Sequence, residues 1–301
     1  MSTKAASFAK LRIHWILDWD GTITQHDTLD TLVSVAASTK PAFPTSDRWS
    51  QVTKAYLQDY TVTLDNLISG SRLPATVLEE KDLLHQLRAV EKRSLTRVSD
   101  SGIFTGLTRA KLDQGARSAF ETRQIEMRNG FEGFFQYTQN RISQGDEFTI
   151  LSVNWSRRFL ASCLAASGSP VPLPNILCNE LEGLDRDAPS TGRIVSSIIA
   201  SGDKLRELEC LRGKDLSSID NRTIVYIGDS WTDLEALLAA DLGICIRSDP
   251  MGSAQQKLAD ALERLDIVCP RLSHWPKSDD EWRVVWVRDF EEIRAWAETG
   301  L

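Results

Sequence analysis

Short, unbroken runs of apolar residues recur along the chain of 301 residues, and each run stops abruptly at a polar loop. The first run, Ile13–Leu17, is rich in β-forming residues and ends at the sequence Asp-Trp-Asp-Gly-Thr. An apolar run of this length that ends in a glycine turn is typical of a central strand covered on both faces. The same pattern predicts three further strands, at Phe148–Val153, Thr223–Ile227 and Leu242–Ile246.

Segments with a helical spacing of apolar residues lie between these runs, at Phe131–Ser143, Trp155–Ala166, Lys204–Arg212 and Thr232–Ala240. Strands that alternate with helices indicate a parallel sheet with right-handed crossovers. The predicted fold class is therefore α/β, with a Rossmann-like parallel sheet as its core. Ligands of such sheets bind at the carboxyl ends of the strands, which is where this chain carries its acidic loops.

The residues between the first two strands break this alternation. Residues 25–127 contain no convincing buried strand, and Thr76–Val98 shows the clearest helical spacing among them. A long helical stretch inserted after the first strand predicts a separate domain. We therefore expect a mostly helical cap domain at residues 25–127, inserted into an α/β core that comprises residues 1–24 and 128–301.

The last part of the chain gives weaker patterns. Turn residues separate Ile176–Cys178 from Arg193–Val195, and we expect these two short runs to pair as a hairpin. Residues Asp289–Ala297 are predicted to close the chain as a helix. Four tryptophans of this tail are expected to cover the core: Trp275, Trp282, Trp286 and Trp296.

Composition and charge argue against several classes of function. The chain has 42% hydrophobic and 26% charged residues, as an ordinary globular protein does. Its formal net charge of -7 argues against broad binding of nucleic acid, which needs a basic surface. No apolar run reaches the ~18 residues that span a bilayer, so we expect no membrane segment.

The cysteines and the first residues bear on the compartment. Five cysteines are scattered without a C-x-x-C pair, and the first residues lack the apolar centre of a signal peptide. These features favour free thiols in a reducing compartment, so we expect a cytoplasmic protein. A mitochondrial presequence is the alternative, since Lys4, Lys10 and Arg12 precede any acidic residue, but the first predicted strand begins close behind them and we favour a frayed terminus. The four histidines lie far apart in the sequence, which argues against a zinc site.

Asp18 and Asp20 directly follow the first predicted strand. Two carboxylates this close repel each other, which raises one pKa unless a cation neutralises both. Such a pair can act as nucleophile and general acid/base, and in this context we favour that interpretation over a purely structural acidic turn after a strand. Gly21, the next residue, lets the backbone approach a ligand closely.

Asp229 and Asp233 follow another predicted strand, in the sequence Gly-Asp-Ser-Trp-Thr-Asp. A helix that begins at Ser230 would place both carboxylates on one face. Acidic residues also stabilise a helix N-terminus, which explains one of them without any function. Oxygen ligands from two strand ends suit Mg²⁺, so this pattern predicts a magnesium site together with Asp18.

Two further residues are candidates for binding an anion. Ser152 lies at the end of the second strand, where its hydroxyl and the neighbouring amides could donate to a phosphate. Lys204 opens a predicted helix, where a cation is mildly unfavourable for the helix dipole. A lysine in that position indicates an anionic partner, weakly on its own evidence.

Together, the sequences D-W-D-G-T, L-S-V-N, G-D-K and G-D-S-W-T-D resemble the four motifs of the haloacid dehalogenase (HAD) superfamily. A helical insertion between the first and second motifs resembles the phosphoserine-phosphatase-like branch, which carries a C1-type cap in that place. The stretches G-D-S-W-T-D-L-E-A-L-L-A-A-D and S-T-G-R-I are similar to those of the methionine-salvage enol-phosphate phosphatases. The motifs cover both ends of the core, whereas the cap matches no particular specificity.

This resemblance implies a magnesium-dependent phosphatase. Asp18 would be the nucleophile and form an aspartyl-phosphate, while Asp20 would protonate the leaving oxygen and then activate water. Asp18, the backbone carbonyl of Asp20 and Asp229 would hold Mg²⁺, with Asp233 in support. The positive charges would offset the charge on the phosphoryl oxygens.

The transferring phosphoryl would be held by Ser152, by the amides of Val153 and Asn154, and by Lys204. We expect a small phosphorylated metabolite as the substrate. A phosphotransferase or nucleotidase with the same machinery is an alternative, as is a catalytically idle binding protein of the same fold.

Three tryptophans occupy variable positions in these loops: Trp19, Trp155 and Trp231. They could stack a ring-bearing substrate, or they could pack the loops onto the core. Packing is the favoured interpretation for Trp19, and both interpretations stay open for Trp155 and Trp231.

Overall fold

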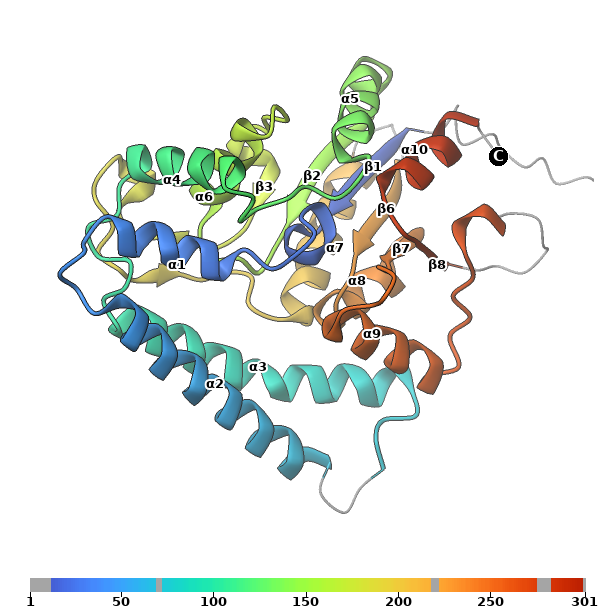
Figure 1. Ribbon diagram of the computed structural model, residues 1–301. Coiled ribbons are helices and arrows are strands. Elements are labelled where there is room, and N and C mark those ends of the chain that lie inside the picture. Colours follow the sequence, from blue (N-terminus) through green and yellow to red (C-terminus); the bar gives the residue numbers. More distant parts are fainter. Residues whose placement is uncertain (1–11, 69–71, 218–221, 275–282, 300–301) are drawn as a thin grey trace, which may run out of the picture.

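The computed structural model describes residues 12–68, 72–217, 222–274 and 283–299. Its main sheet is parallel throughout, with the strand order β3-β2-β1-β6-β7-β8 (Figure 1). The strands are β1 (Ile13–Leu17), β2 (Glu147–Leu151), β3 (Ile176–Leu177), β6 (Thr223–Gly228), β7 (Leu242–Ile246) and β8 (Val284–Val287). The four strands predicted from the sequence form the centre of this sheet, and the α/β fold class is confirmed.

Helices cover both faces of the sheet because the central strands carry apolar side chains on both faces. All five residues of β1 are buried. Trp15 and Leu17 belong to one hydrophobic cluster, whereas Ile16 belongs to a second one. The first cluster takes residues from α5 (Phe131–Arg141), α6 (Arg157–Ala166) and α10 (Phe290–Thr299). The second takes residues from α7 (Ser201–Ser217), α8 (Leu234–Ala239) and α9 (Ser253–Arg264).

The residues between β1 and α5 are mostly helical, as the sequence predicts. They leave and re-enter the core at one place, since Thr24 bridges Met127 and the Gln25 N–H donates to the Glu126 carbonyl oxygen (2.9 Å). The helices are α1 (Leu29–Ser38), α2 (Thr45–Ile68), α3 (Val77–Asp100) and α4 (Arg109–Glu121).

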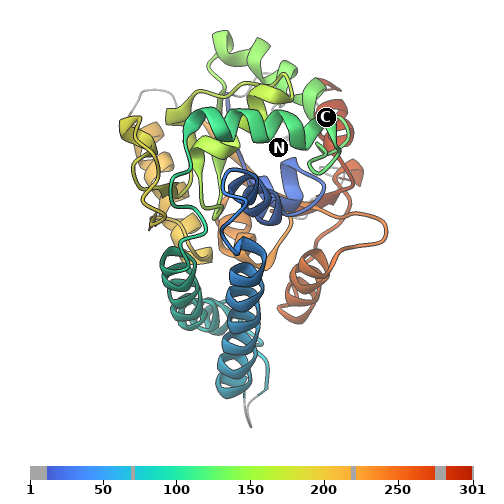
Figure 2. The ribbon, with the colours of Figure 1, turned by 60° about the vertical axis from the view of Figure 1, so that its left-hand side comes forward.

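These four helices fall into two pairs. Helix α4 packs against α6 of the core and against α1, whereas α2 and α3 pack against each other as a long hairpin. Figure 2 shows this hairpin projecting from the rest of the molecule. Helix α3 begins with a capping box, in which Thr76 accepts from the Glu79 N–H (3.3 Å) and Glu79 bonds back to the Thr76 N–H (3.1 Å). The helix predicted at residues 76–98 is therefore present.

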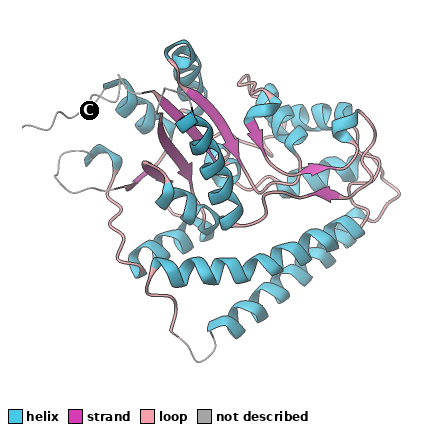
Figure 3. Cartoon of the chain, turned by 180° about the vertical axis from the view of Figure 1, so that it is seen from behind, coloured by secondary structure: helices cyan, strands magenta, loops and turns pink. Residues whose placement is uncertain are grey.

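The predicted hairpin is wrong in its pairing. Ile176–Leu177 joins the main sheet as β3, parallel to β2, because the backbone at Ile176 continues the ladder beside Ile150. The antiparallel partner of β5 (Ile194–Val195) is β4 (Glu180–Leu181) instead. Figure 3 shows this small two-stranded sheet apart from the main one, near one end of α3.

The tail adds an edge strand and a closing helix. Strand β8, which pairs with β7, was not predicted. Helix α10 begins at Phe290, and Asp289 Oδ1 accepts from the Glu291 N–H (3.1 Å) just before it. Trp296 is buried and Trp286 partly buried, whereas Trp275 and Trp282 lie outside the described residues.

Two expectations on composition can be compared with the fold. All five cysteines are free thiols. Within the described ranges, the helices are too short or too polar to cross a bilayer.

Candidate active site

Asp18 lies where two neighbouring strands end together. Leu17 pairs with Ile227 of β6, and the Asp18 N–H donates to the Ile227 carbonyl oxygen (2.9 Å). The Asp18 carboxylate is buried, with Oδ1 at 2.8 Å from Lys204 Nζ. Burial raises the pKa of Asp18 to about 7, although the Lys204 charge acts to lower it. The charged form of this carboxylate therefore depends on neighbouring cations.

Lys204 joins two of the predicted site residues. It lies in the first turn of α7, is fully buried, and donates from Nζ to Asp233 Oδ1 (2.6 Å) as well as pairing with Asp18. Burial alone would lower the pKa of Lys204, but the two carboxylates raise it above its usual value. The ammonium group stays charged beside the predicted nucleophile.

Asp20 lies in the helical turn η2 (Trp19–Ile23) and is held by two polar residues from other segments. Its Oδ1 accepts from the Thr28 N–H (2.7 Å) and the Thr28 hydroxyl (2.6 Å). Its Oδ2 accepts from Asn154 Nδ2 (2.8 Å). Burial and the nearby Asp27 raise the pKa of Asp20 to about 8. A carboxyl group with this pKa can deliver a proton near neutral pH.

Three buried carboxylates meet at the ends of β1 and β6. One carboxylate oxygen from each of Asp18, Asp229 and Asp233 lies within 4.8 Å of the others. Asp229 Oδ1 accepts from the Thr22 hydroxyl (3.0 Å). Burial raises the pKa of Asp229 well above its usual value, and the charges of Asp233 and Asp18 raise it further. When all three carboxylates are ionised, they carry more negative charge than Lys204 alone neutralises.

This donor set fits Mg²⁺. Carboxylate oxygens are the hard ligands that this ion prefers, and those of Asp18, Asp229 and Asp233 lie close enough together to share one ion. A cation bound there would favour the ionised forms that burial disfavours. The backbone at Gly21 is also close to the group: a Cβ there would lie 2.4 Å from Asp229 Oδ2, and the residue has φ +73°. Glycine is therefore required where the first loop meets Asp229.

The sequence suggested that Asp233 lies beside Asp229 on one face of a regular helix. In the structure, Asp233 instead supports the loop that carries Asp229. It ends the 3₁₀ turn η6 (Trp231–Asp233). Its Oδ2 accepts from the N–H groups of Asp229 (3.1 Å) and Ser230 (2.9 Å). Although burial opposes ionisation, Lys204 and the Tyr226 hydroxyl hold the pKa of Asp233 below its usual value. Asp233 is thus an ionised residue that fixes the backbone around Asp229.

The predicted phosphate-binding residues follow β2, next to β1 in the sheet. Ser152 is buried, and its hydroxyl oxygen accepts from the Asn154 N–H (3.1 Å). The Asn154 side chain donates to Asp20, so this residue positions the predicted general acid. Val153 is half-buried, and its carbonyl oxygen accepts from Asn179 Nδ2 (2.9 Å).

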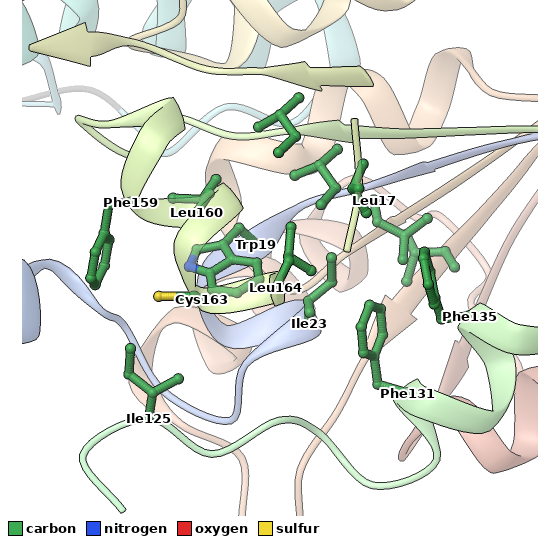
Figure 4. Close-up of a cluster of buried hydrophobic side chains, with 14 of the residues drawn as sticks. Leu17, Trp19, Ile23, Ile125, Phe131, Phe135, Phe159, Leu160, Cys163 and Leu164 are labelled. Carbon is green, nitrogen blue, oxygen red and sulfur yellow. The ribbon is translucent and has the colours of Figure 1, made fainter. Parts of the chain in front are cut away.

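Trp19 packs in the core, as the sequence favoured. It is fully buried and donates from Nε1 to the Thr28 hydroxyl (3.0 Å). Figure 4 shows its ring among Ile23 and the apolar side chains that α6 contributes: Phe159, Leu160, Cys163 and Leu164.

The other two loop tryptophans also have protein partners. Trp155 is 8% exposed, and its ring meets Trp49 and Phe104 edge to face, with centroids at 5.7 and 6.0 Å. Trp231 is half-buried and donates from Nε1 to Glu80 Oε1 of α3 (2.6 Å). Both rings therefore join the core to the inserted helices.

Sequence reasoning did not identify two residues that hold the first loop. Thr28 binds Asp20, as described above. Arg128 is buried and donates from Nη2 to the Gly21 carbonyl oxygen (2.6 Å) and from Nε to the Thr22 carbonyl oxygen (2.9 Å). No pattern distinguishes Thr28, whereas Arg128 had one signal, because it precedes the Asn129-Gly130 turn that returns the chain to the core.

Comparisons with known proteins identify the family of the chain. Over residues 16–238, the chain matches the model of the haloacid dehalogenase-like hydrolase family. It is 30% identical to a CTO1 family protein of Schizosaccharomyces pombe over 273 residues, which cover 87% of this chain and 90% of that protein. It is 24% identical to the bifunctional TH2 protein, mitochondrial, of Arabidopsis thaliana over 251 residues, which cover 77% of this chain but 39% of that protein.

Solved structures share the fold at low sequence identity. A cytosolic 5'-nucleotidase IIIB bound to cytidine has a TM-score of 0.58 and 14% identity, covering 97% of this chain and 87% of its own. A substrate-bound phosphoserine phosphatase has a TM-score of 0.51 and 16% identity, and the match covers 95% of this chain and 98% of that one. The fold, the match over most of the chain and the resemblance of its four motifs lead to one conclusion: this chain belongs to the haloacid dehalogenase-like hydrolase family.

Proposed function

We propose that this protein is a Mg²⁺-dependent phosphatase that hydrolyses a small phosphomonoester through an aspartyl-phosphate on Asp18. The observation that carries the proposal is the pair of unlike carboxyls after β1. Burial raises the pKa of both, but Asp18 lies against the buried ammonium of Lys204, which favours its charged form, whereas the hydrogen-bond partners of Asp20 are the neutral residues Thr28 and Asn154. One carboxyl can attack while its neighbour donates a proton.

The reaction would run in two steps. An oxygen of Asp18 attacks the phosphorus, the bond to the leaving oxygen breaks, and Asp20 donates its proton to that oxygen. Asp20 then takes a proton from a water molecule that attacks the same phosphorus, which releases inorganic phosphate and restores Asp18. Thr28 and Asn154 keep Asp20 in one orientation for both proton transfers.

Positive charge would stabilise the phosphoryl group in both steps. Asp18, Asp229 and the carbonyl oxygen of Asp20 would hold the metal, with Asp233 supporting the loop. When bound, Mg²⁺ supplies positive charge that offsets the negative charge on the phosphoryl oxygens. Lys204 adds a fixed cation beside Asp18.

The remaining assignments concern phosphate binding and access. We assign the phosphate contacts to the Ser152 hydroxyl and to the amides of Val153 and Asn154, which follow the strand beside β1. We assign the role of a cap domain to residues 25–127, since the chain leaves and re-enters the core at one bridge, Thr24 to Met127. A cap of this kind excludes water during the first step and readmits it for the second.

Phosphate release by the purified protein tests the proposal. The panel contains phosphoserine, sugar phosphates, nucleoside monophosphates, thiamine and pyridoxal phosphates and an aryl phosphate, each with Mg²⁺. Nucleotides belong in it because a nucleotidase is among the structural neighbours. We expect one compound to reach a kcat/KM above ~10⁴ M⁻¹ s⁻¹. Absence of turnover on every compound, the aryl phosphate included, would contradict the proposal and favour a binding protein.

A further inference from the structure

Helix α3 makes a buried polar contact with the loop that carries Asp229 and Asp233. The residue at this contact is Glu80, whose side chain is completely buried. Its Oε1 accepts from Trp231 Nε1 (2.6 Å), and Trp231 lies between the two aspartates in the sequence. A carboxylate buried in this way is costly unless other groups bind it.

Arg264, the last residue of α9, neutralises this carboxylate. Its Nη1 lies 2.9 Å from Glu80 Oε2, and its Nη2 lies 3.0 Å from Glu80 Oε1. The same Nη1 donates to the carbonyl oxygen of Pro74, just before α3. Two parallel bonds of an arginine to a carboxylate fix its orientation as well as its charge. Glu80 therefore presents Oε1 to Trp231 from a defined position.

The indole of Trp231 transmits this position to the metal-binding loop. Its ring packs against the apolar side chains Leu83, Leu87 and Val90 of α3. Trp231 also begins the short turn that ends at Asp233, whose carboxylate accepts from the N–H of Asp229. The loop is thus held at one end by Asp233 and at its middle by Glu80.

We propose that Glu80 is a positioning residue for the cluster of three carboxylates at Asp18, Asp229 and Asp233. It acts through its hydrogen bond with Trp231. The inserted helices then complete the metal site as well as covering it. This inference rests on the metal site of the proposed function, but its effect on Mg²⁺ binding does not depend on the hydrolysis of any ester.

Two substitutions remove the same hydrogen bond from its two ends. Trp231→Phe keeps an aromatic ring but loses the N–H donor, and Glu80→Met keeps the approximate volume but loses the acceptor. The control is Arg93→Ala on the same helix, since Arg93 pairs with Asp59 of α2 and not with the core. Circular dichroism establishes that each variant is folded.

Calorimetric titration with Mg²⁺ alone measures the effect. We expect each single variant to bind Mg²⁺ about tenfold more weakly, as is usual when a residue that orients a ligand is lost. The double variant should lie within about twofold of the weaker single variant, because both act through one bond. Arg93→Ala should stay within about twofold of the wild type.

Turnover of the aryl phosphate gives a second readout. If Glu80 acts by positioning, kcat of the single variants falls at low Mg²⁺ and recovers when Mg²⁺ is saturating, with KM for the phosphate ester little changed. Mg²⁺ affinity within about twofold of the wild type in both folded single variants would overturn the inference. So would a double variant weakened by the product of the two single effects. A wild type that binds Mg²⁺ but turns over no ester would refute the phosphatase function alone, since calorimetry still decides the role of Glu80.

Discussion

The end of the parallel sheet and the α2–α3 hairpin differ in how their charges are surrounded. At the sheet, Asp18, Lys204 and Asp233 are buried, and they pair at 2.6–2.8 Å. In the hairpin, Arg93 pairs with Asp59 at 2.7 Å, but the Arg93 side chain is 49% exposed. Water screens the second pair and hardly reaches the first. Similar distances therefore carry very different energies.

Because of this difference, we expect the end of the sheet to carry the chemistry and the hairpin to tolerate substitutions. All residues of β1 are buried, whereas the buried residues of the 24-residue helix α2 are Thr45 and Val52. Substitutions at the sheet should affect turnover and stability together. Substitutions in the hairpin should do so only where it touches the core, as it does at Glu80.

The largest expected effect is on turnover. Asp18→Asn should lower kcat at least about a thousandfold, or ~4 kcal/mol, because it removes the nucleophile while keeping the shape of the side chain. The matched control, Asp59→Asn in the hairpin, should keep activity within about twofold. Phosphate release from the aryl phosphate measures both. Substantial turnover by Asp18→Asn would assign the chemistry to another residue.

The next effect is on stability. Lys204→Met should lower the free energy of unfolding by about 3–5 kcal/mol, because it leaves the buried carboxylates of Asp18 and Asp233 without their cation. Arg93→Ala should leave the free energy of unfolding nearly unchanged, because the Arg93 side chain is about half exposed to water and Asp59 keeps Arg97 as a partner. Urea denaturation of both variants, without Mg²⁺, makes the comparison. Equal losses would mean that burial does not separate the two regions.

Adding Mg²⁺ should stabilise the folded protein by binding to the three clustered carboxylates of Asp18, Asp229 and Asp233. Binding at a hundred times the dissociation constant raises the free energy of unfolding by about 2.7 kcal/mol. Asp229→Asn should remove most of this gain, because it removes one of the three clustered carboxylates. Thermal unfolding with and without Mg²⁺ measures the shift. A shift of the same size in Asp229→Asn would place the metal elsewhere.

The smallest effect concerns a titratable group within the hairpin. Burial raises the pKa of Glu91 to about 7, with Tyr56 Oη donating to its Oε1 (2.9 Å). Since the pKa is higher in the folded state than in the unfolded state, stability falls as pH rises from about 4 to 7. Glu91→Gln keeps an acceptor for Tyr56 and should be more stable than the wild type by about 1 kcal/mol at pH 8.

The two proteins should be equally stable below pH 4, where Glu91 is protonated in both states. Urea denaturation across this pH range gives the comparison. A difference between wild type and Glu91→Gln that does not vary with pH would show that Glu91 titrates normally.

The sequence predicted the centre of the sheet and the residues that gather at its end. Buried parallel strands are continuous apolar runs, so β1 and β7 were predicted with their observed bounds. β8 was missed because four residues at a sheet edge give too short a pattern. The pairing of Ile176–Leu177 was wrong because a two-residue strand carries no information about its partner.

The roles of some site residues could not be predicted from the sequence, because they depend on contacts between distant segments. Asn154 was predicted to bind phosphate through its amide, but its side chain also holds Asp20, 134 positions away. Glu80 resembles any acidic residue in the first turn of a helix, and only the fold brings it to Trp231 and Arg264. The bounds of the cap and the cytoplasmic location stay predictions.

Trapping the intermediate tests the central claim most directly. The wild-type protein is quenched with acid during turnover of the best substrate with Mg²⁺, and the peptide that contains Asp18 is analysed by mass spectrometry. The account predicts one phosphoryl group on that peptide, attached to Asp18 and absent from Asp18→Asn. Steady turnover with no covalent phosphate on any peptide, or phosphate on a different residue, would contradict it.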